Sequence, residues 1–93
     1  MEFLKYLEKI LIQRKKELPN GSYTSRLFQE GEDSILKKVI EESGEVLLAF
    51  KNNKKEEMIH EAADLIFHLM VALVEKNIYL EDVVQELEKR HKK

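Results

Sequence analysis

Apolar residues recur at three- and four-residue intervals along most of the chain, a spacing typical of amphipathic α-helices. No stretch shows the alternation expected of a strand. The pattern predicts an all-α fold, a helical bundle in a single domain spanning residues 1–93, with about four main helices and a short one. The main helices are expected over residues 2–17, 33–51, 54–76 and from Leu80 onward, and the short one over residues 26–30.

Turn and cap signals separate these helices. Pro19-Asn20-Gly21 is the strongest turn signal in the chain and should end the first helix. Asn53, with Glu56 three residues later, resembles a capping box and predicts the start of the fourth helix. Gly44 lies inside the third helix, where glycine costs about 1 kcal/mol relative to alanine. We expect such a glycine to allow the close approach of another helix or a ligand.

The fourth predicted helix is apolar on nearly every side from Met58 to Val74. A helix of this kind must be surrounded, and a 93-residue monomer can hardly surround it. We therefore expect a homo-oligomer, most simply a two-fold dimer that completes the bundle. The last helix should turn Val83, Val84 and Leu87 inward.

Composition excludes several classes of protein. Sixteen basic and eighteen acidic residues give a net charge of −2, which argues against a nucleic-acid binder. The absence of cysteine excludes disulfides and thiolate metal sites. No apolar run approaches the roughly 20 residues needed to cross a bilayer, and the first residues do not resemble a signal peptide. A cytoplasmic protein without membrane contacts is expected.

Five carboxylates interrupt the two central predicted helices: Glu41, Glu42, Glu45, Glu61 and Asp64. A helix advances about 100° per residue, so the first three fall within one arc and the last two share a face. The short connection should make the helices antiparallel and bring the acidic faces together. Such acids repel unless they take up protons or surround a cation. Oxygen ligands favour Mg²⁺, or Mn²⁺, over Zn²⁺.

Groups that could bind an anion lie near these acids in the sequence. Lys37 and Lys38 come one turn before the first carboxylate, and Arg26 follows a polar segment with the hydroxyls of Ser22, Tyr23 and Thr24. That segment can donate to an anion or cap the short helix. Acids for metal beside bases for anions are the pattern expected of phosphoryl chemistry.

Other interpretations of these residues compete with a Mg²⁺ site. Glu57 and His60 have the Glu-x-x-His spacing of di-iron bundle proteins, but a single-chain site of that kind needs two copies. His60 and His68 are better interpreted as residues that support a site or pack in the core. The acids could also form the solvated surface of a non-catalytic helical dimerisation module.

The acidic motif resembles that of the all-α nucleoside-triphosphate pyrophosphohydrolases, the MazG-type superfamily. Within it, the chain is most similar to the phosphoribosyl-ATP pyrophosphohydrolase family of histidine biosynthesis, over about residues 20–91. The similar stretches are Gly21-Ser22-Tyr23-Thr24, Leu27-Phe28, Gly31, Lys37-Lys38-Val39, the acidic block Glu41–Glu45, Glu61-Ala62-Ala63-Asp64-Leu65, His68 and Leu87–Arg90.

This resemblance implies Mg²⁺-dependent hydrolysis of phosphoribosyl-ATP to phosphoribosyl-AMP and pyrophosphate. By the family's motif, the five acids would hold metal, Lys37 and Lys38 together with Arg26 would hold phosphates, and Ser22 to Thr24 would close over the nucleotide. The family usually has glycine where this chain has Ile40, and more often a small residue such as alanine at Gly44. A housekeeping pyrophosphohydrolase of canonical or damaged nucleotides is the alternative enzyme.

Overall fold

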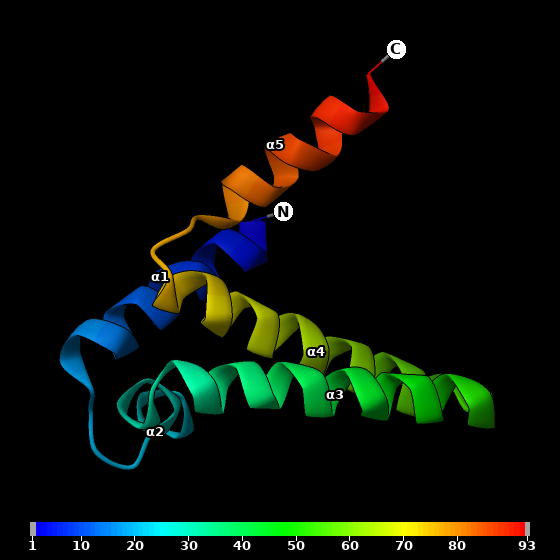
Figure 1. Ribbon diagram of the computed structural model, residues 1–93, viewed down its shortest axis with the longest axis horizontal. Helices are drawn as coiled ribbons and strands as arrows, with labels where there is room; N and C mark the ends of the chain where they lie inside the picture. The colour runs from blue at the N-terminus through cyan, green and yellow to red at the C-terminus, as the bar shows by residue number, and fades with distance from the viewer. Residues whose placement is uncertain (1, 93) are drawn as a thin grey trace.

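The computed structural model describes residues 2–92, which form five α-helices and no strand (Figure 1). The all-α prediction is confirmed, and the predicted ends of the main helices lie within about a residue of the observed ones. The short helix is longer than expected because it begins three residues earlier. The helices are α1 (Glu2–Glu17), α2 (Tyr23–Glu30), α3 (Glu32–Asn52), α4 (Lys55–Glu75) and α5 (Leu80–His91).

The helices α3 and α4 form a long antiparallel hairpin, and α1 and α2 pack against one end of it (Figure 1). The antiparallel arrangement expected from the short connection is confirmed. The hydrophobic core lies at the covered end, where apolar side chains from α1, α2, α3 and α4 meet. Its buried members are Leu11, Leu27, Phe28, Ile35, Met70, Val71 and Val74.

A single residue, Gly31, joins α2 to α3. It has φ 101°, a conformation that residues with a Cβ rarely adopt. Its N–H donates to the carbonyl of Leu27 at 3.1 Å, and its own carbonyl accepts from Ile35 at 3.2 Å. Gly31 thus ends one helix and begins the next, so α2 turns sharply away from α3 (Figure 1).

The predicted capping box at Asn53 is wrong. Asn53 has φ 56° and ends α3 in the left-handed conformation, with its N–H donating to the carbonyl of Phe50 at 3.2 Å. Asparagine suits this position at a helix end, but an N-cap needs extended dihedrals. Lys54 takes the N-cap position of α4 instead, without a side-chain hydrogen bond.

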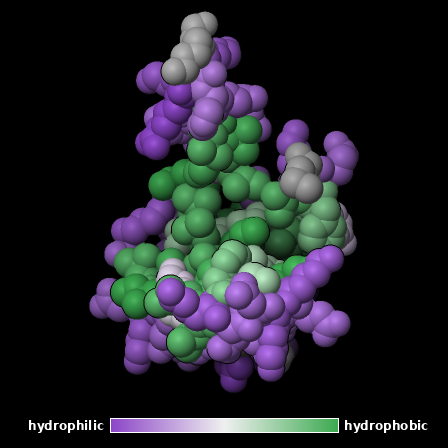
Figure 2. Space-filling model, turned by 90° about the vertical axis from the view of Figure 1, so that its right-hand side faces the viewer, coloured by the Kyte–Doolittle hydropathy of each residue, from purple (hydrophilic) through white to green (hydrophobic). Residues whose placement is uncertain are grey.

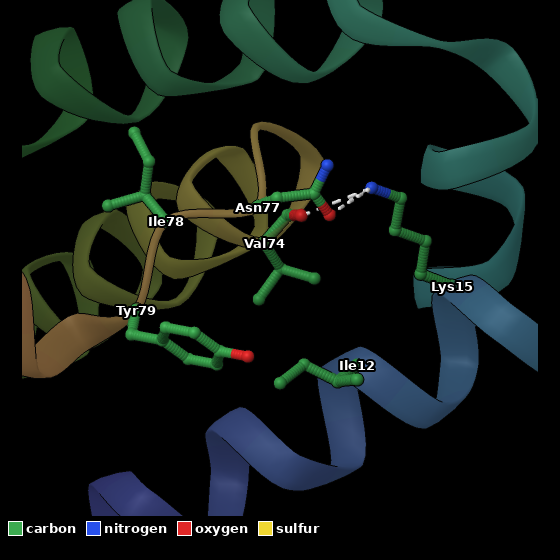
Figure 3. Close-up of a pocket in the computed structure, with 6 residues that line it drawn as sticks. All are labelled: Ile12, Lys15, Val74, Asn77, Ile78 and Tyr79. Atoms are coloured by element: carbon green, nitrogen blue, oxygen red, sulfur yellow. Dashed lines mark hydrogen bonds between the residues drawn. The ribbon is translucent and has the colours of Figure 1, made fainter.

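Lys15 of α1 stabilises the end of α4 at the small cavity drawn in Figure 3. Its Nζ donates to the carbonyls of Val74 at 3.2 Å and Glu75 at 3.0 Å, and to Oδ1 of Asn77 at 3.3 Å. Positive charge suits a helix C-terminus, where carbonyls lack partners. The cavity measures about 100 Å³, and we interpret this junction as structural.

The prediction that α5 turns its apolar residues inward is wrong for the single chain. None of its residues is buried, and Val83, Val84 and Leu87 are all exposed. The helix projects away from the hairpin (Figure 1). It is attached at its start, where Glu8 of α1 accepts from the N–H of Leu80 at 2.6 Å. Figure 2 shows apolar side chains gathered between this projecting helix and the body of the molecule.

Two apolar stripes remain on the hairpin outside the core. By helical spacing, the α3 stripe lies on the opposite flank from Glu41 and Glu45. The expectation that α4 must be covered on every side is not met by one chain, and the predicted dimer stays a prediction. The stripes consist of Leu36, Ile40, Leu47 and Phe50 on α3 and of Ile59, Ile66 and Leu69 on α4, all exposed.

Ile40 and Gly44, the two positions that depart from the family's pattern, have free space around them. Ile40 is 73% exposed, and a Cβ at Gly44 would meet no atom of the described residues within 4 Å. No helix of the single chain therefore approaches Gly44 closely, and the approach of a ligand there stays a prediction. In residues 2–92, no helix is both long enough and apolar enough to cross a membrane.

Candidate active site

The hairpin brings carboxylates of α3 and α4 together. Glu42 and Glu45 on α3, and Asp64 on α4, lie near enough to Glu61 for their negative charges to raise its pKa. Partial burial of the Glu61 carboxyl is the largest cause of that raised pKa, and the nearby His60 opposes it. Four of the five predicted acids thus form one cluster around Glu61.

His60 joins the acids on α4. One ligand atom from each of His60, Glu61 and Asp64 lies within 4.8 Å of the others, close enough to surround a cation. His60 Nε2 is 3.4 Å from Asp64 Oδ2. This position differs from the interpretation of His60 as a supporting or packing residue. Its four-residue spacing from Asp64, which places both on one helix face, is the signal that could have identified it.

The fifth acid, Glu41, shares a cation with Glu42 of the cluster. Lys38 Nζ is 3.6 Å from Glu41 Oε1 and 3.8 Å from Glu42 Oε1. The pKa of Lys38 is raised, chiefly by the charge that Tyr23 can carry and also by these two acids, although burial lowers it. Lys38 therefore stays positively charged beside the carboxylates, and its predicted role in phosphate binding stays a prediction.

A cavity of about 240 Å³ adjoins this ion pair. The two lysines predicted to bind phosphate both line it, and Glu41 lines it from the acidic side. The cavity lies where α2 packs on α3, so α2 supplies its other wall. The residues around it are Tyr23, Leu27, Glu30, Ser34, Lys37, Lys38 and Glu41.

The polar segment before Arg26 is not a loop. Ser22 is the N-cap of α2, and its hydroxyl accepts from the N–H of Ser25 at 3.2 Å. Capping, one of the two interpretations of this segment, is confirmed. Tyr23 and Thr24 belong to the first turn of α2 and not to a loop. The binding of a nucleotide by Ser22, Tyr23 and Thr24 stays a prediction. The Arg26 guanidinium lies 5.8 Å from the centre of the Tyr23 ring.

His68 connects this turn to the acidic helix. It is buried on α4, as the packing interpretation predicted. Its Nε2 lies 2.8 Å from the hydroxyl oxygen of Tyr23, and its Nδ1 lies 2.8 Å from the backbone carbonyl oxygen of Asp64. The sequence gives no signal for this link, because Tyr23 and His68 are 45 residues apart.

The site thus places oxygen ligands for a hard cation next to a cavity with two lysines. Hard divalent cations prefer carboxylate ligands, and ammonium groups bind phosphate oxygens. The arrangement can hold a cation at its carboxylates and an anion at its lysines.

Comparison with known proteins agrees with this geometry. The family model described as phosphoribosyl-ATP pyrophosphohydrolase matches residues 4–91. The phosphoribosyl-ATP pyrophosphatase of Leptospira biflexa is 59% identical over 91 residues, which is 98% of this chain and 99% of that protein. The protein of the same name from Bacillus mycoides is 50% identical over 92 residues, or 99% of this chain and 86% of that protein.

A longer relative matches as well. The histidine biosynthesis bifunctional protein HisIE of Caldanaerobacter subterraneus subsp. tengcongensis is 53% identical over 93 residues, all of this chain but only 45% of that protein. The chain therefore corresponds to less than half of the bifunctional protein. The match of the family model over nearly the whole chain, with relatives above 50% identity, shows that this chain belongs to the phosphoribosyl-ATP pyrophosphohydrolase family.

Proposed function

We propose that this chain is the phosphoribosyl-ATP pyrophosphatase of histidine biosynthesis. It would hydrolyse phosphoribosyl-ATP to phosphoribosyl-AMP and pyrophosphate, with water breaking the anhydride bond between the α- and β-phosphates. The observation that carries the proposal is the carboxylate cluster around Glu61, with the lysine-lined cavity beside it. Membership of the family supports the substrate.

The donor set fits Mg²⁺ or Mn²⁺. Glu61 and Asp64 provide oxygen ligands within reach of each other. Partial burial is the largest cause of the raised pKa of Glu61, and Asp64, Glu45 and Glu42 add a repulsion that a cation would relieve. We assign the metal to Glu61 and Asp64 with Glu42 and Glu45, and place Glu41 at the edge toward Lys38. A bound Mg²⁺ supplies neutralising charge for the triphosphate oxygens and the departing pyrophosphate.

The chain's own residues bind and orient the substrate. Lys37 and Lys38 donate to phosphate oxygens in the cavity they line. Tyr23 and Leu27 form the wall opposite them on α2. A carboxylate of the cluster takes the proton of the attacking water as the new phosphorus–oxygen bond forms.

We also propose that two copies of the chain associate through the apolar stripes of α3 and α4. One copy leaves Ile40, Leu47 and Ile66 exposed, and a monomer rarely leaves so many neighbouring apolar residues in water. A two-fold pairing would cover the stripes of both hairpins and complete a four-helix arrangement. The acidic flank of α3 points away from its stripe, so the pairing leaves the carboxylates accessible.

The test is pyrophosphate release from phosphoribosyl-ATP, compared with dATP and dCTP, with and without Mg²⁺. We expect a strong preference for phosphoribosyl-ATP and no turnover in EDTA. Glu61→Gln and Asp64→Asn should each lose at least about a hundredfold in kcat, because a carboxylate ligand becomes a neutral amide. A preference for dATP or dCTP would contradict the proposed substrate and favour a housekeeping pyrophosphohydrolase.

A further inference from the structure

The hydrogen bonds of His68 fix the position of its proton. Its Nδ1 is 2.8 Å from the Asp64 carbonyl oxygen, which can only accept, so Nδ1 carries a hydrogen and donates. In the neutral ring Nε2 is then an acceptor. The Tyr23 hydroxyl, 2.8 Å away, donates to it.

This arrangement directs the Tyr23 hydroxyl. Because its hydrogen points at His68, the phenol oxygen is left to accept from donors on its other side. Lys38 lines the same cavity, and Tyr23 is the main cause of the raised pKa of Lys38. Tyr23 and Lys38 therefore line one cavity, and the Lys38 ammonium group there pairs with Glu41 and Glu42.

Packing holds the His68 ring in the orientation that these bonds require. The ring is 5% exposed, and its centre lies 5.2 Å from that of Phe67 and 5.9 Å from that of Tyr23, both in edge-to-face geometry. A buried polar ring is costly unless its nitrogens are paired. Both nitrogens of His68 are paired, and their two partners lie on different helices of the site.

We propose that His68 is a positioning residue for the reaction, which acts through Tyr23. By binding the backbone at Asp64 and the hydroxyl of Tyr23, it fixes the lysine-lined cavity relative to the carboxylates of α4. A phosphate held at Lys38 and a metal held at Asp64 then keep a constant separation. His68 itself does not touch the substrate, and the inference rests on the proposed function.

The test is a double-mutant cycle in the KM for phosphoribosyl-ATP, with His68→Leu, Tyr23→Phe and the double variant. Losing one hydrogen bond that positions a binding residue should raise KM about tenfold. The kcat should stay within about threefold of the wild type, because the carboxylates remain in place. The KM of the double variant should be no higher than that of either single variant, because both changes remove the same interaction.

Two further variants separate positioning from packing. In His68→Gln the amide oxygen can still accept from Tyr23, so the KM should return most of the way to the wild-type value. His91→Leu is the matched control, because His91 Nδ1 also lies 2.8 Å from the carbonyl oxygen four residues before it, that of Leu87, but on the exposed end of α5. It should leave KM unchanged.

The outcomes distinguish this inference from the proposed function. If the wild type does not hydrolyse phosphoribosyl-ATP, both are overturned. If it does, but His68→Leu only lowers the melting temperature and leaves KM unchanged, the positioning role alone is wrong. Effects of His68→Leu and Tyr23→Phe that multiply to about a hundredfold in the double variant would also overturn it, because the two residues would then act independently.

Discussion

Where α1 and α2 cover the α3–α4 hairpin, Ile35 and Val71 are 1% and 0% exposed, whereas toward the other end Leu47, Phe50 and Ile59 are all more than half exposed. The same two helices thus have a finished core at one end and open apolar stripes at the other. The difference shows that one chain supplies only part of the cover that its apolar residues require. A second copy is the cover we propose for the stripes.

The candidate site lies between these two regions. Its acids occupy the middle of the hairpin, while Tyr23 and His68 belong to the covered end. The covered end therefore supplies the Tyr23 and His68 side chains, and the middle of the hairpin supplies the negatively charged carboxylates.

The largest effect on stability is expected in the covered core. Leu11→Ala removes a side chain that is 1% exposed and should lower the free energy of unfolding by about 2–5 kcal/mol. Urea denaturation at a low and a high protein concentration measures it. The loss should appear at both concentrations, because this core lies within one chain. If Leu11→Ala lowered the free energy of unfolding only at the high protein concentration, the core would depend on a second copy, and the distinction between a core within one chain and stripes covered by a partner would be wrong.

The next effect concerns the apolar stripe. Leu47→Asp places a charge in the proposed dimer contact and should raise the dimer dissociation constant at least about a hundredfold. Sedimentation analysis over a range of concentrations measures this constant.

Leu48→Asp is the matched control for that substitution. Leu48 is 58% exposed against 59% for Leu47, but it lies about 100° around the helix, toward Glu41 and Glu45. It should leave the dimer intact. Equal effects of the two substitutions, or a wild type that is monomeric at every concentration, would exclude the proposed pairing.

At the site itself, Glu61→Gln should raise the melting temperature in EDTA. The folded-state pKa of Glu61 lies above its ordinary value of 4.5, so its charge costs stability above the folded-state pKa. That cost is lost as the pH falls below 4.5, and the advantage of the variant should vanish there. Thermal melts from pH 4 to 8 measure the difference.

At neutral pH, added Mg²⁺ should make the melting temperature of the wild type higher than that of Glu61→Gln. A cation that binds only the folded wild type stabilises it by mass action, and Glu61→Gln removes one of its ligands. Mg²⁺ should therefore raise the melting temperature of the wild type more than that of the variant. If Mg²⁺ shifts neither protein, the carboxylates are surface acids and the metal assignment is wrong.

Periodicity and turn residues were enough to predict the five helices, the antiparallel hairpin and the grouping of most of the acids. These features depend on spacing along one or two neighbouring helices. The sequence did not predict the role of Asn53, because asparagine suits both the start and the end of a helix. Only the backbone dihedral angles of Asn53 show which of the two roles it has. It also could not reveal the pairing of Tyr23 with His68, because that contact depends on how α2 packs against α4. The apolar residues of α5 were expected to be buried, but no other helix of the single chain covers them.

The smallest effects are expected from two serines in the covered region. Ser22→Ala removes the hydroxyl that caps α2 and should cost about 1 kcal/mol. Ser25 is 1% exposed, and its Oγ has no hydrogen-bond partner among the described residues. Ser25→Ala removes an unpaired buried hydroxyl and should stabilise the fold by up to about 1 kcal/mol. The same substitution three residues apart should thus have opposite signs in urea denaturation. Two losses of equal size would mean that the Ser25 hydroxyl is paired in solution, and that the covered core is less dry than its burial indicates.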